Sequence, residues 1–383
     1  MPISTQICPG VAPAWPELAN SDSLLTSPAW LRAMSGRFGD QTVTIVVADD
    51  GDARLAALAT AQSAPAPGEF YDLHNVLITP APVLPLTDAA RAARTDLMTT
   101  APPADRWVPN LVVMLPGYEC IPVGSGRYDR RLLDELTDGL CRWADKQGLP
   151  TIAFLYTRPE PPGLPAALAD RGFTAVPLSL TWALTVPAGG MTEYLAQLPP
   201  KRRREAGREI QRLTDAGVSV RRLDRAELLA EPTLGTMAAL RAQMVRKYRG
   251  QAQDERERTK IGFLLEDVCA GQAEVFAAEA DGNMIGFALF CPHGDCWYCL
   301  AAGYDYADPR YRFCYFATAF YGAVPAAARA GIKTLAYGQG SGQAKRSRGC
   351  LGTTLTAWVR SSEPELAAAV RASAEITELQ PAS

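Results

Sequence analysis

Glycines and cations are concentrated in one stretch of the 383-residue chain. Residues 331–349 read Gly-Ile-Lys-Thr-Leu-Ala-Tyr-Gly-Gln-Gly-Ser-Gly-Gln-Ala-Lys-Arg-Ser-Arg-Gly, and no Asp or Glu occurs between Asp308 and Glu363. Glycines allow backbone N–H groups to come close to a ligand oxygen, and Lys345 and Arg348 can supply charge-assisted hydrogen bonds beside them. The stretch therefore predicts a site for an anion.

The spelling of this stretch excludes several common loops. A Walker A loop needs Gly directly before the Lys and Ser or Thr after it, and the dinucleotide fingerprint needs Gly where Gln343 stands. Ser341 is one residue out of register for a nucleophile elbow. Gly338, Gly340 and Ser341 remain as candidates for backbone contact with a ligand, and Arg346 is a further cation. A solvated loop is the alternative.

A second basic segment begins at Pro199-Pro200, which favours a helix start. Four cations share one face at helical spacing: Lys201, Arg204, Arg208 and Arg212. Only Glu205 and Glu209 oppose them. Such a face can simply be solvated, or it can neutralise a row of phosphates and make binding depend on salt.

A metal site is not expected. Cys291, His293, Cys296 and Cys299 flank a short turn in a predicted hairpin, and their spacing matches no structural zinc set well. His74 is the only other histidine, which makes a Ser–His–Asp triad an unsuitable interpretation.

Composition is that of a globular protein, with 48% hydrophobic and 21% charged residues and a formal net charge of −3. A net acidic chain meets a polyanion only through a local patch, so DNA is not an expected partner. Nine scattered cysteines predict reduced thiols and a cytoplasmic protein. No stretch has the length and apolar character of a membrane span.

The elements that must position these residues repeat in the two halves. A hairpin over 42–61 is followed by a helix and strand over 129–156, and a hairpin over 274–291 by a helix and strand over 311–337. Each half is therefore expected to be a mixed, half-open sheet with helices packed on it, a mixed α/β fold. We predict an irregular arm and two domains: 1–22, 23–187 and 191–383.

Three stretches together resemble a known family. They are Ser27-Pro-Ala-Trp30 with the hairpin after it, Leu198-Pro-Pro-Lys-Arg-Arg-Arg204 leading to Gly217-Val-Ser-Val220, and Tyr337-Gly-x-Gly-Ser-x-x-x-Lys345-x-x-Arg348-Gly349. Over about residues 23–360 the chain resembles the actinobacterial GNAT-like "peptidoglycan biosynthesis" proteins, which are related to the Fem-type aminoacyl-tRNA-dependent transferases. The resemblance implies two tandem GNAT-like domains, each a mixed half-open sheet flanked by helices.

The resemblance also implies an activity. The enzyme would move an aminoacyl group from aminoacyl-tRNA to an amine, in a peptidoglycan precursor or a natural-product intermediate, and form an amide bond. An aminoacyl ester is already activated, so the protein has chiefly to position a neutral amine and stabilise the developing oxyanion. Aminoacyl-tRNA is then a co-substrate, and no cofactor or metal is required.

Roles can be assigned to residues as a hypothesis. Lys345 and Arg348 hold the tRNA terminus or the oxyanion, and the backbone of 338–342 donates N–H groups. Tyr337 orients the substrate. Asp305 follows a predicted strand and could accept a proton from the attacking amine, although such an Asp is as readily a helix cap or turn residue. Phosphates would meet the basic helix.

Two other functions stay open. One is a GNAT enzyme that uses acyl-CoA, although the usual pyrophosphate loop is missing where Asp308-Pro-Arg-Tyr-Arg312 stands. The other is a catalytically silent protein that binds RNA or cell wall. Loss of transfer on RNase treatment would indicate aminoacyl-tRNA, and persistence with a CoA thioester would indicate the GNAT enzyme.

Overall fold

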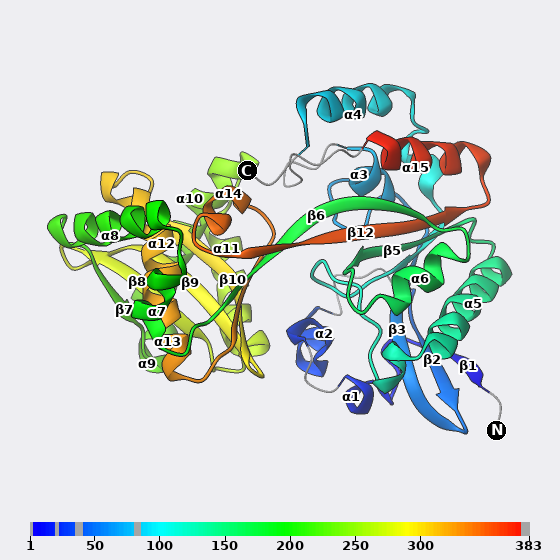
Figure 1. Ribbon diagram of the computed structural model, residues 1–383, viewed down its shortest axis with the longest axis horizontal. Coiled ribbons are helices and arrows are strands. Elements are labelled where there is room, and N and C mark those ends of the chain that lie inside the picture. The colour runs from blue at the N-terminus through cyan, green and yellow to red at the C-terminus, as the bar shows by residue number, and fades with distance from the viewer. Residues whose placement is uncertain (1–2, 20–22, 35–40, 80–85, 377–383) are drawn as a thin grey trace. The chain divides into compact units, whose positions relative to one another are not determined.

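The structure is a computed structural model that describes residues 3–19, 23–34, 41–79 and 86–376 (Figure 1). The chain divides into two compact units. Met1–Thr181 and Thr353–Ser383 form the first unit, and Trp182–Gly352 forms the second. The predicted boundary near residue 190 thus lies close to the start of the second unit, but the C-terminal segment belongs to the first.

The first unit contains a mixed sheet in the order β1-β2-β3-β4-β5-β12. These strands are β1 (Ser4–Pro9), β2 (Thr42–Asp49), β3 (Asp52–Gln62), β4 (Asn110–Val113), β5 (Thr151–Thr157) and β12 (Leu351–Ser361). Its helices are α1 (Trp15–Leu18), α2 (Pro28–Met34), α3 (Leu73–Leu77), α4 (Asp88–Thr100), α5 (Arg130–Gln147), α6 (Gly163–Ala169) and α15 (Pro364–Ile376). Strand β12 joins this unit because it pairs antiparallel with β5, for example Arg360 with Ile152.

Helix α5 lies in the segment 129–156, where the sequence predicted a helix followed by a strand. Asp129 caps its start by accepting from the Arg131 N–H, and Gly148 ends it with φ 69°. Its buried face carries Leu133, Leu136 and other leucines into the core of the first unit. The predicted hairpin is also present, as β2 pairs antiparallel with β3.

The predicted irregular arm, 1–22, is wrong in part. Residues Ser4–Pro9 form edge strand β1, which pairs antiparallel with β2, and Trp15–Leu18 form a helical turn. Alternating partly buried and exposed residues in β1 suit an edge strand, but the neighbouring prolines concealed this pattern. Residues 1, 2 and 20–22 of the arm lie outside the described part of the chain.

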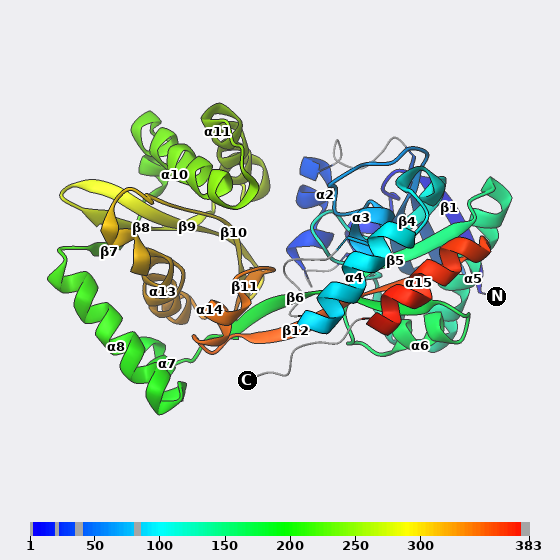
Figure 2. The same cartoon turned by 90° about the horizontal axis from the view of Figure 1, so that it is seen from above.

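The second unit contains a sheet in the order β6-β11-β10-β9-β8-β7. These strands are β6 (Thr174–Thr185), which begins in the first unit, β7 (Ser219–Arg222), β8 (Glu274–Ala280), β9 (Asn283–His293), β10 (Cys296–Tyr304) and β11 (Thr334–Gly338). Its helices are α7 (Gly190–Gln197), α8 (Pro200–Asp215), α9 (Arg225–Leu228), α10 (Glu231–Arg249), α11 (Asp254–Phe263), α12 (Cys314–Phe316), α13 (Ala323–Arg329) and α14 (Gly342–Arg346). Figure 2 shows α10 and α11 on one face of β8–β10, with α13 and α8 on the opposite face.

The helix predicted over 311–330 is divided into shorter pieces. A π-helical turn, η7 (Ala317–Gly322), separates α12 from α13. Gly322 lies in that turn, and a Cβ atom there would come within 2.9 Å of the Val220 side chain on β7. The glycine therefore permits a close approach of this helix to the sheet.

Parallel pairing of β10 and β11 positions the glycine-rich stretch. The two strands pair only from Cys296 with Thr334 to Tyr298 with Ala336. Beyond that point β10 has a bulge between Cys299 and Ala301, and β11 ends. Because the carboxyl ends of parallel strands lie at the same edge of a sheet, the segments after β10 and after β11 share one edge of the second unit.

Candidate functional site

The glycine-rich turn follows the end of β11 in an unusual backbone conformation. Gly338, Gly340 and Ser341 all have positive φ, at 62°, 77° and 47°. A Cβ atom at either glycine would meet nothing within 4 Å, so φ rather than packing favours glycine there. No hydrogen bond among the described residues takes up the N–H groups of Gln339, Gly340 or Ser341.

Lys345 holds this turn from inside. Its side chain is 4% exposed, and Nζ donates to the carbonyl oxygens of Tyr337, Gly338 and Gln339 at 2.8, 3.1 and 2.9 Å. All three N–H groups of the ammonium are thus used within the turn. Burial lowers the pKa of the ammonium to about 8. The ammonium does not project toward a ligand as the hypothesis from the sequence required.

The direction of these carbonyls determines the direction of the turn's N–H groups. In a trans peptide the C=O and the following N–H point in opposite directions. The Gly338 and Gln339 carbonyls point to the ammonium, so the N–H groups of Gln339 and Gly340 point away from it. Lys345 therefore orients peptide dipoles whose N–H ends are free to meet an anion.

Arg348 is buried in an ion pair. Its Nη2 lies 2.5 Å from Oε2 of Glu209, its Nε donates to the Tyr321 hydroxyl at 3.1 Å, and its guanidinium lies 3.9 Å from the Phe316 ring centroid. Burial lowers the pKa of Arg348, but the interactions with Glu209 and Tyr321 together outweigh burial and raise it. The Arg348 carbonyl accepts from the Tyr194 hydroxyl at 3.0 Å. Arg348 thus ties the end of the turn to α7, α8 and η7.

Tyr337 and Asp305 are engaged by neighbouring residues. The buried Tyr337 hydroxyl donates to the Ala319 carbonyl at 2.7 Å, and its ring stacks on Phe320 with centroids 4.6 Å apart. Asp305 accepts from the Ala307 N–H at 3.0 Å, which is the geometry of a turn residue. Their direct catalytic roles stay predictions.

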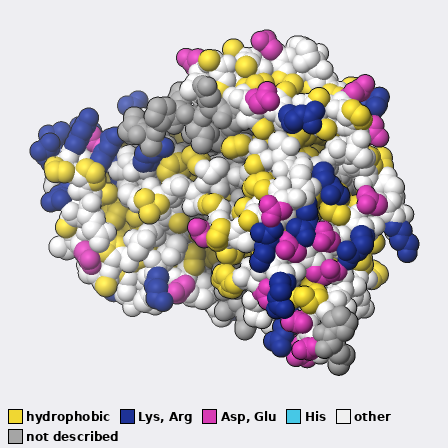
Figure 3. Space-filling view, turned by 45° about the vertical axis from the view of Figure 1, so that its right-hand side comes forward, with side chains coloured by type: hydrophobic (Ala, Val, Ile, Leu, Met, Phe, Trp, Pro, Cys, Tyr) yellow, Lys and Arg dark blue, Asp and Glu magenta, His cyan; other side chains and the backbone are white. Residues whose placement is uncertain are grey.

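The cations of α8 have a different environment. All four are exposed, and none pairs with a carboxylate within the described ranges: Lys201, Arg204, Arg208 and Arg212. Arg212 lies 5.8 Å from a ring centroid, that of Phe313. In Figure 3, Lys and Arg side chains gather at the upper left, where α8 lies, with few acidic side chains among them. Arginines on α5 instead pair with acids, as Arg130 does with Asp134 at 2.8 Å.

Arg346 is the remaining predicted cation. It is exposed and lies 5.5 Å above the Trp182 ring. A Cβ atom at Gly342 would come within 2.8 Å of the same ring, so the turn packs closely on Trp182. Arg346 is therefore positioned on the outside of the turn while Lys345 and Arg348 are inside it.

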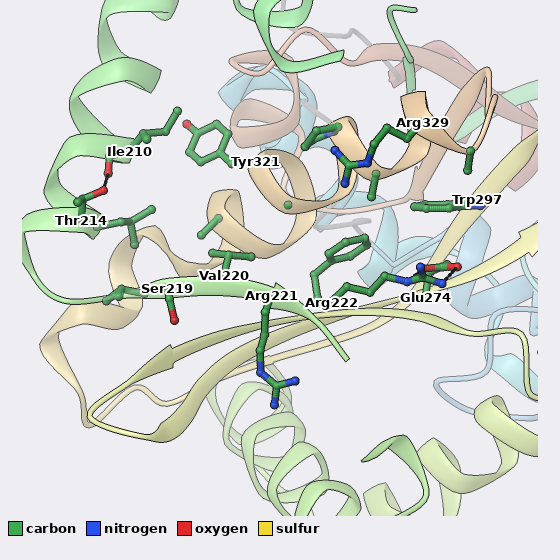
Figure 4. A pocket seen from close by; sticks show the side chains of 18 of the residues that line it. Ile210, Thr214, Ser219, Val220, Arg221, Arg222, Glu274, Trp297, Tyr321 and Arg329 are labelled. Carbon is green, nitrogen blue, oxygen red and sulfur yellow. Dashed lines mark hydrogen bonds and ion pairs between the residues drawn. The ribbon is translucent and has the colours of Figure 1, made fainter. Parts of the chain in front are cut away.

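A groove of about 980 Å³ lies between α8, β7 and the η7–α13 helix (Figure 4). Its apolar lining includes Leu213, Val220, Phe276, Trp297, Ala317 and Pro325. Arg222 pairs with Glu274 at 2.5 Å on one wall, while the exposed Arg329 has no carboxylate partner in the part of the chain that the structure describes. Tyr321 lines the end of the groove near α8, and its hydroxyl donates to Glu209 at 2.6 Å.

Sequence reasoning missed this groove and the Glu209–Arg348–Tyr321 cluster. One signal was present: Glu209 lies three and four residues from Ala206 and Leu213, which are the buried positions of α8. An acid on the apolar face of a helix indicates a buried cation as its partner. Nothing local identified Arg348 as that cation, because 139 residues separate the two.

The fold of this chain is shared with known structures. The crystal structure of FemX matches with a TM-score of 0.57 and 12% identity, over 92% of this chain and 96% of that one. A conserved protein of unknown function from Bacteroides thetaiotaomicron VPI-5482 matches with a TM-score of 0.51 and 16% identity, over 89% and 90%. A tandem GNAT protein from the clavulanic acid biosynthesis pathway matches with a TM-score of 0.47 and 13% identity, over 94% of this chain and 99% of that one. The expected mixed α/β class is confirmed.

The family is established by sequence. Residues 106–379 match the FemAB-like family, described as peptidoglycan biosynthesis and recognition, and the chain belongs to this family. A comparison with curated proteins found no match. Membership of a Fem-like family indicates an acyltransferase related to peptidoglycan. Among the described residues, no helix is long and apolar enough to cross a membrane, and no group of three or more His, Cys, Asp or Glu could hold a metal ion.

Proposed function

We propose that this protein transfers an aminoacyl group from aminoacyl-tRNA to an amine acceptor, a peptide or a small molecule. The observation that carries the proposal is the row of four exposed cations on α8, without carboxylate partners among the described residues, in a member of the FemAB-like family. Exposed arginines are commonly neutralised by acids, as on α5. A row left unpaired is suited to a polyanion. Such a donor would place the reaction in the cytoplasm.

The α8 row matches a nucleic acid backbone in length as well as in charge. Lys201 and Arg212 are eleven residues apart, which corresponds to about 16 Å of helix. Several phosphates of one strand fit within that length, since a strand carries one charge per about 3.4 Å of helix axis. The opposite side of α8 lines the groove, so one helix contributes to both surfaces.

The glycine-rich turn supplies the electrostatic part of the mechanism. When the acceptor amine attacks the ester carbonyl, negative charge develops on its oxygen. The free N–H groups of Gln339 and Gly340 are donors of the type that stabilises such charge, and Lys345 fixes their direction. Lys345 is thereby a positioning residue. The amine's proton passes to solvent or to a neighbouring base, and the tRNA leaves as its 3′-terminal hydroxyl.

A transfer assay tests the proposal. Purified protein, tRNA charged with labelled amino acids and an extract containing acceptor amines should yield labelled amide, and RNase treatment beforehand should abolish it. Persistence of transfer after RNase, with a CoA thioester as the donor, would instead identify an acyl-CoA-dependent enzyme. Tight retention of tRNA without any transfer would identify a binding protein.

A further inference from the structure

Lys247, near the end of α10, points its ammonium at three tyrosine rings. Its Nζ lies 3.9 Å from the centroid of Tyr306, 5.4 Å from that of Tyr311 and 5.7 Å from that of Tyr248. Ring faces carry partial negative charge, and several of them around one ammonium form the arrangement that proteins use to bind organic cations. We call these three rings the tyrosine cage.

The cage holds its cation by ring faces alone. Within the described ranges Lys247 pairs with no carboxylate, whereas the adjacent Arg246 lies 2.8 Å from Asp254. Burial, followed by the nearby Tyr248, raises the pKa of the Tyr306 hydroxyl, so the phenol stays neutral. The attraction in the cage is therefore that of a neutral aromatic surface for a cation.

The rings have supports other than Lys247. The Tyr306 N–H donates to the Gln243 side chain at 3.1 Å, and the Tyr306 and Tyr311 rings meet edge to face with centroids 4.9 Å apart. Lys247 itself is exposed and is three residues from Gly250, where α10 has ended. Its ammonium can leave without disturbing a buried side chain, and the two supported rings remain in place.

We propose that the tyrosine cage is a binding site for an organic ammonium group and that the Lys247 ammonium occupies it until a ligand displaces it. The ligand assigned is a small compound that carries an organic ammonium group. Tyr306 and Tyr311 follow the carboxyl end of β10, and the cage therefore lies beyond the end of that strand.

A structural tether is the competing interpretation, in which Lys247 only fastens α10 to the segment after β10. The two differ in what removal of the ammonium does. An occupied cage gains affinity for an added ammonium when its own cation is removed, whereas a tether loses stability and gains no affinity. Exposed cation–π contacts have strengths that correspond to about a fivefold change in affinity.

The experiment measures probe binding by saturation-transfer NMR and calorimetry, without tRNA or transfer. The probes are tetramethylammonium, glycine methyl ester and the uncharged N-acetylglycine methyl ester. In Lys247→Ala we expect the two cationic probes to bind about fivefold more tightly than in the wild type, and the N-acetyl ester not to bind. Lys333→Ala removes an exposed lysine that pairs with Asp295 at 3.0 Å, and it should leave affinity unchanged.

Tyr306→Leu in the Lys247→Ala background should abolish binding, and Tyr306→Phe, which keeps the ring, should retain it. Thermal unfolding of each variant establishes that it is folded. Equal affinity of the wild type and Lys247→Ala for tetramethylammonium would overturn the cage, and so would binding of the uncharged N-acetyl ester as tight as that of glycine methyl ester. Neither measurement uses tRNA, so the result is independent of the proposed function.

Discussion

Neutralising two central cations of α8, in Arg204→Gln/Arg208→Gln, should weaken tRNA binding and reduce its dependence on salt. On B-DNA, each contact between a cation and a phosphate contributes about −0.9 to the slope of log K against log salt. We apply the same value to the duplex regions of tRNA. Four contacts then give a slope of about −3.6, and the variant about −1.8. Between 50 and 200 mM salt, the wild type should lose affinity about 150-fold and the variant about 12-fold.

Fluorescence anisotropy with labelled, uncharged tRNA measures both slopes, since phosphate contacts do not require the aminoacyl group. Arg130→Gln on α5 is the matched control, because Arg130 is an exposed helical arginine that already pairs with Asp134. Its slope should equal that of the wild type. An unchanged slope in the α8 variant would refute the assignment of α8 to RNA, and an equal reduction in the control would attribute the effect to overall charge.

Three further predictions concern the interior of the second unit. Lys345→Met should lower kcat about 100-fold with little change in KM for the donor, because oxyanion donors act in the transition state; single-turnover kinetics check this. Glu209→Gln should lower the free energy of unfolding by about 3–5 kcal/mol by leaving Arg348 buried without its partner, whereas Glu205→Gln on the exposed side should have no measurable effect in urea titrations. Because the folded pKa of Lys345 is about 8 and the unfolded one about 10.5, the unfolded state binds more protons in this window. The free energy of unfolding of the wild type relative to Lys345→Met should therefore rise by about 3 kcal/mol from pH 8 to 10.5.

Local patterns in the sequence predicted the elements well. The helix and strand predicted over 129–156 are present as α5 and β5, and the hairpin predicted over 42–61 is present as β2 and β3. Long-range pairing had no such signal. Strand β12 pairs with β5 across about 200 residues, and its own sequence is equally compatible with the second unit. The predicted domain 191–383 therefore included Thr353–Ser383, which belong to the first unit.

In the candidate site, too, local features could be predicted from the sequence and long-range contacts could not. Exposed cations such as Arg204 lie on the helix face that their spacing predicted, because exposure of a helix face follows from periodicity, and their role stays a prediction. Lys345 and Arg348 are buried instead, because the sequence around a cation does not show its partner. The partner of Arg348 is Glu209 on another helix, and the partners of Lys345 are backbone carbonyls, which every residue possesses.

The absence of acids around the glycine-rich stretch suits the buried position of Lys345. An acid near Lys345 would compete with the carbonyls of Tyr337, Gly338 and Gln339 for the buried ammonium and release them from their common direction. With only carbonyls available, the ammonium fixes the peptide planes, and the N–H groups of the turn face outward. In the proposed function the charge of Lys345 therefore acts indirectly, by orienting neutral N–H donors toward an anion. The cations proposed to contact phosphates directly lie on α8.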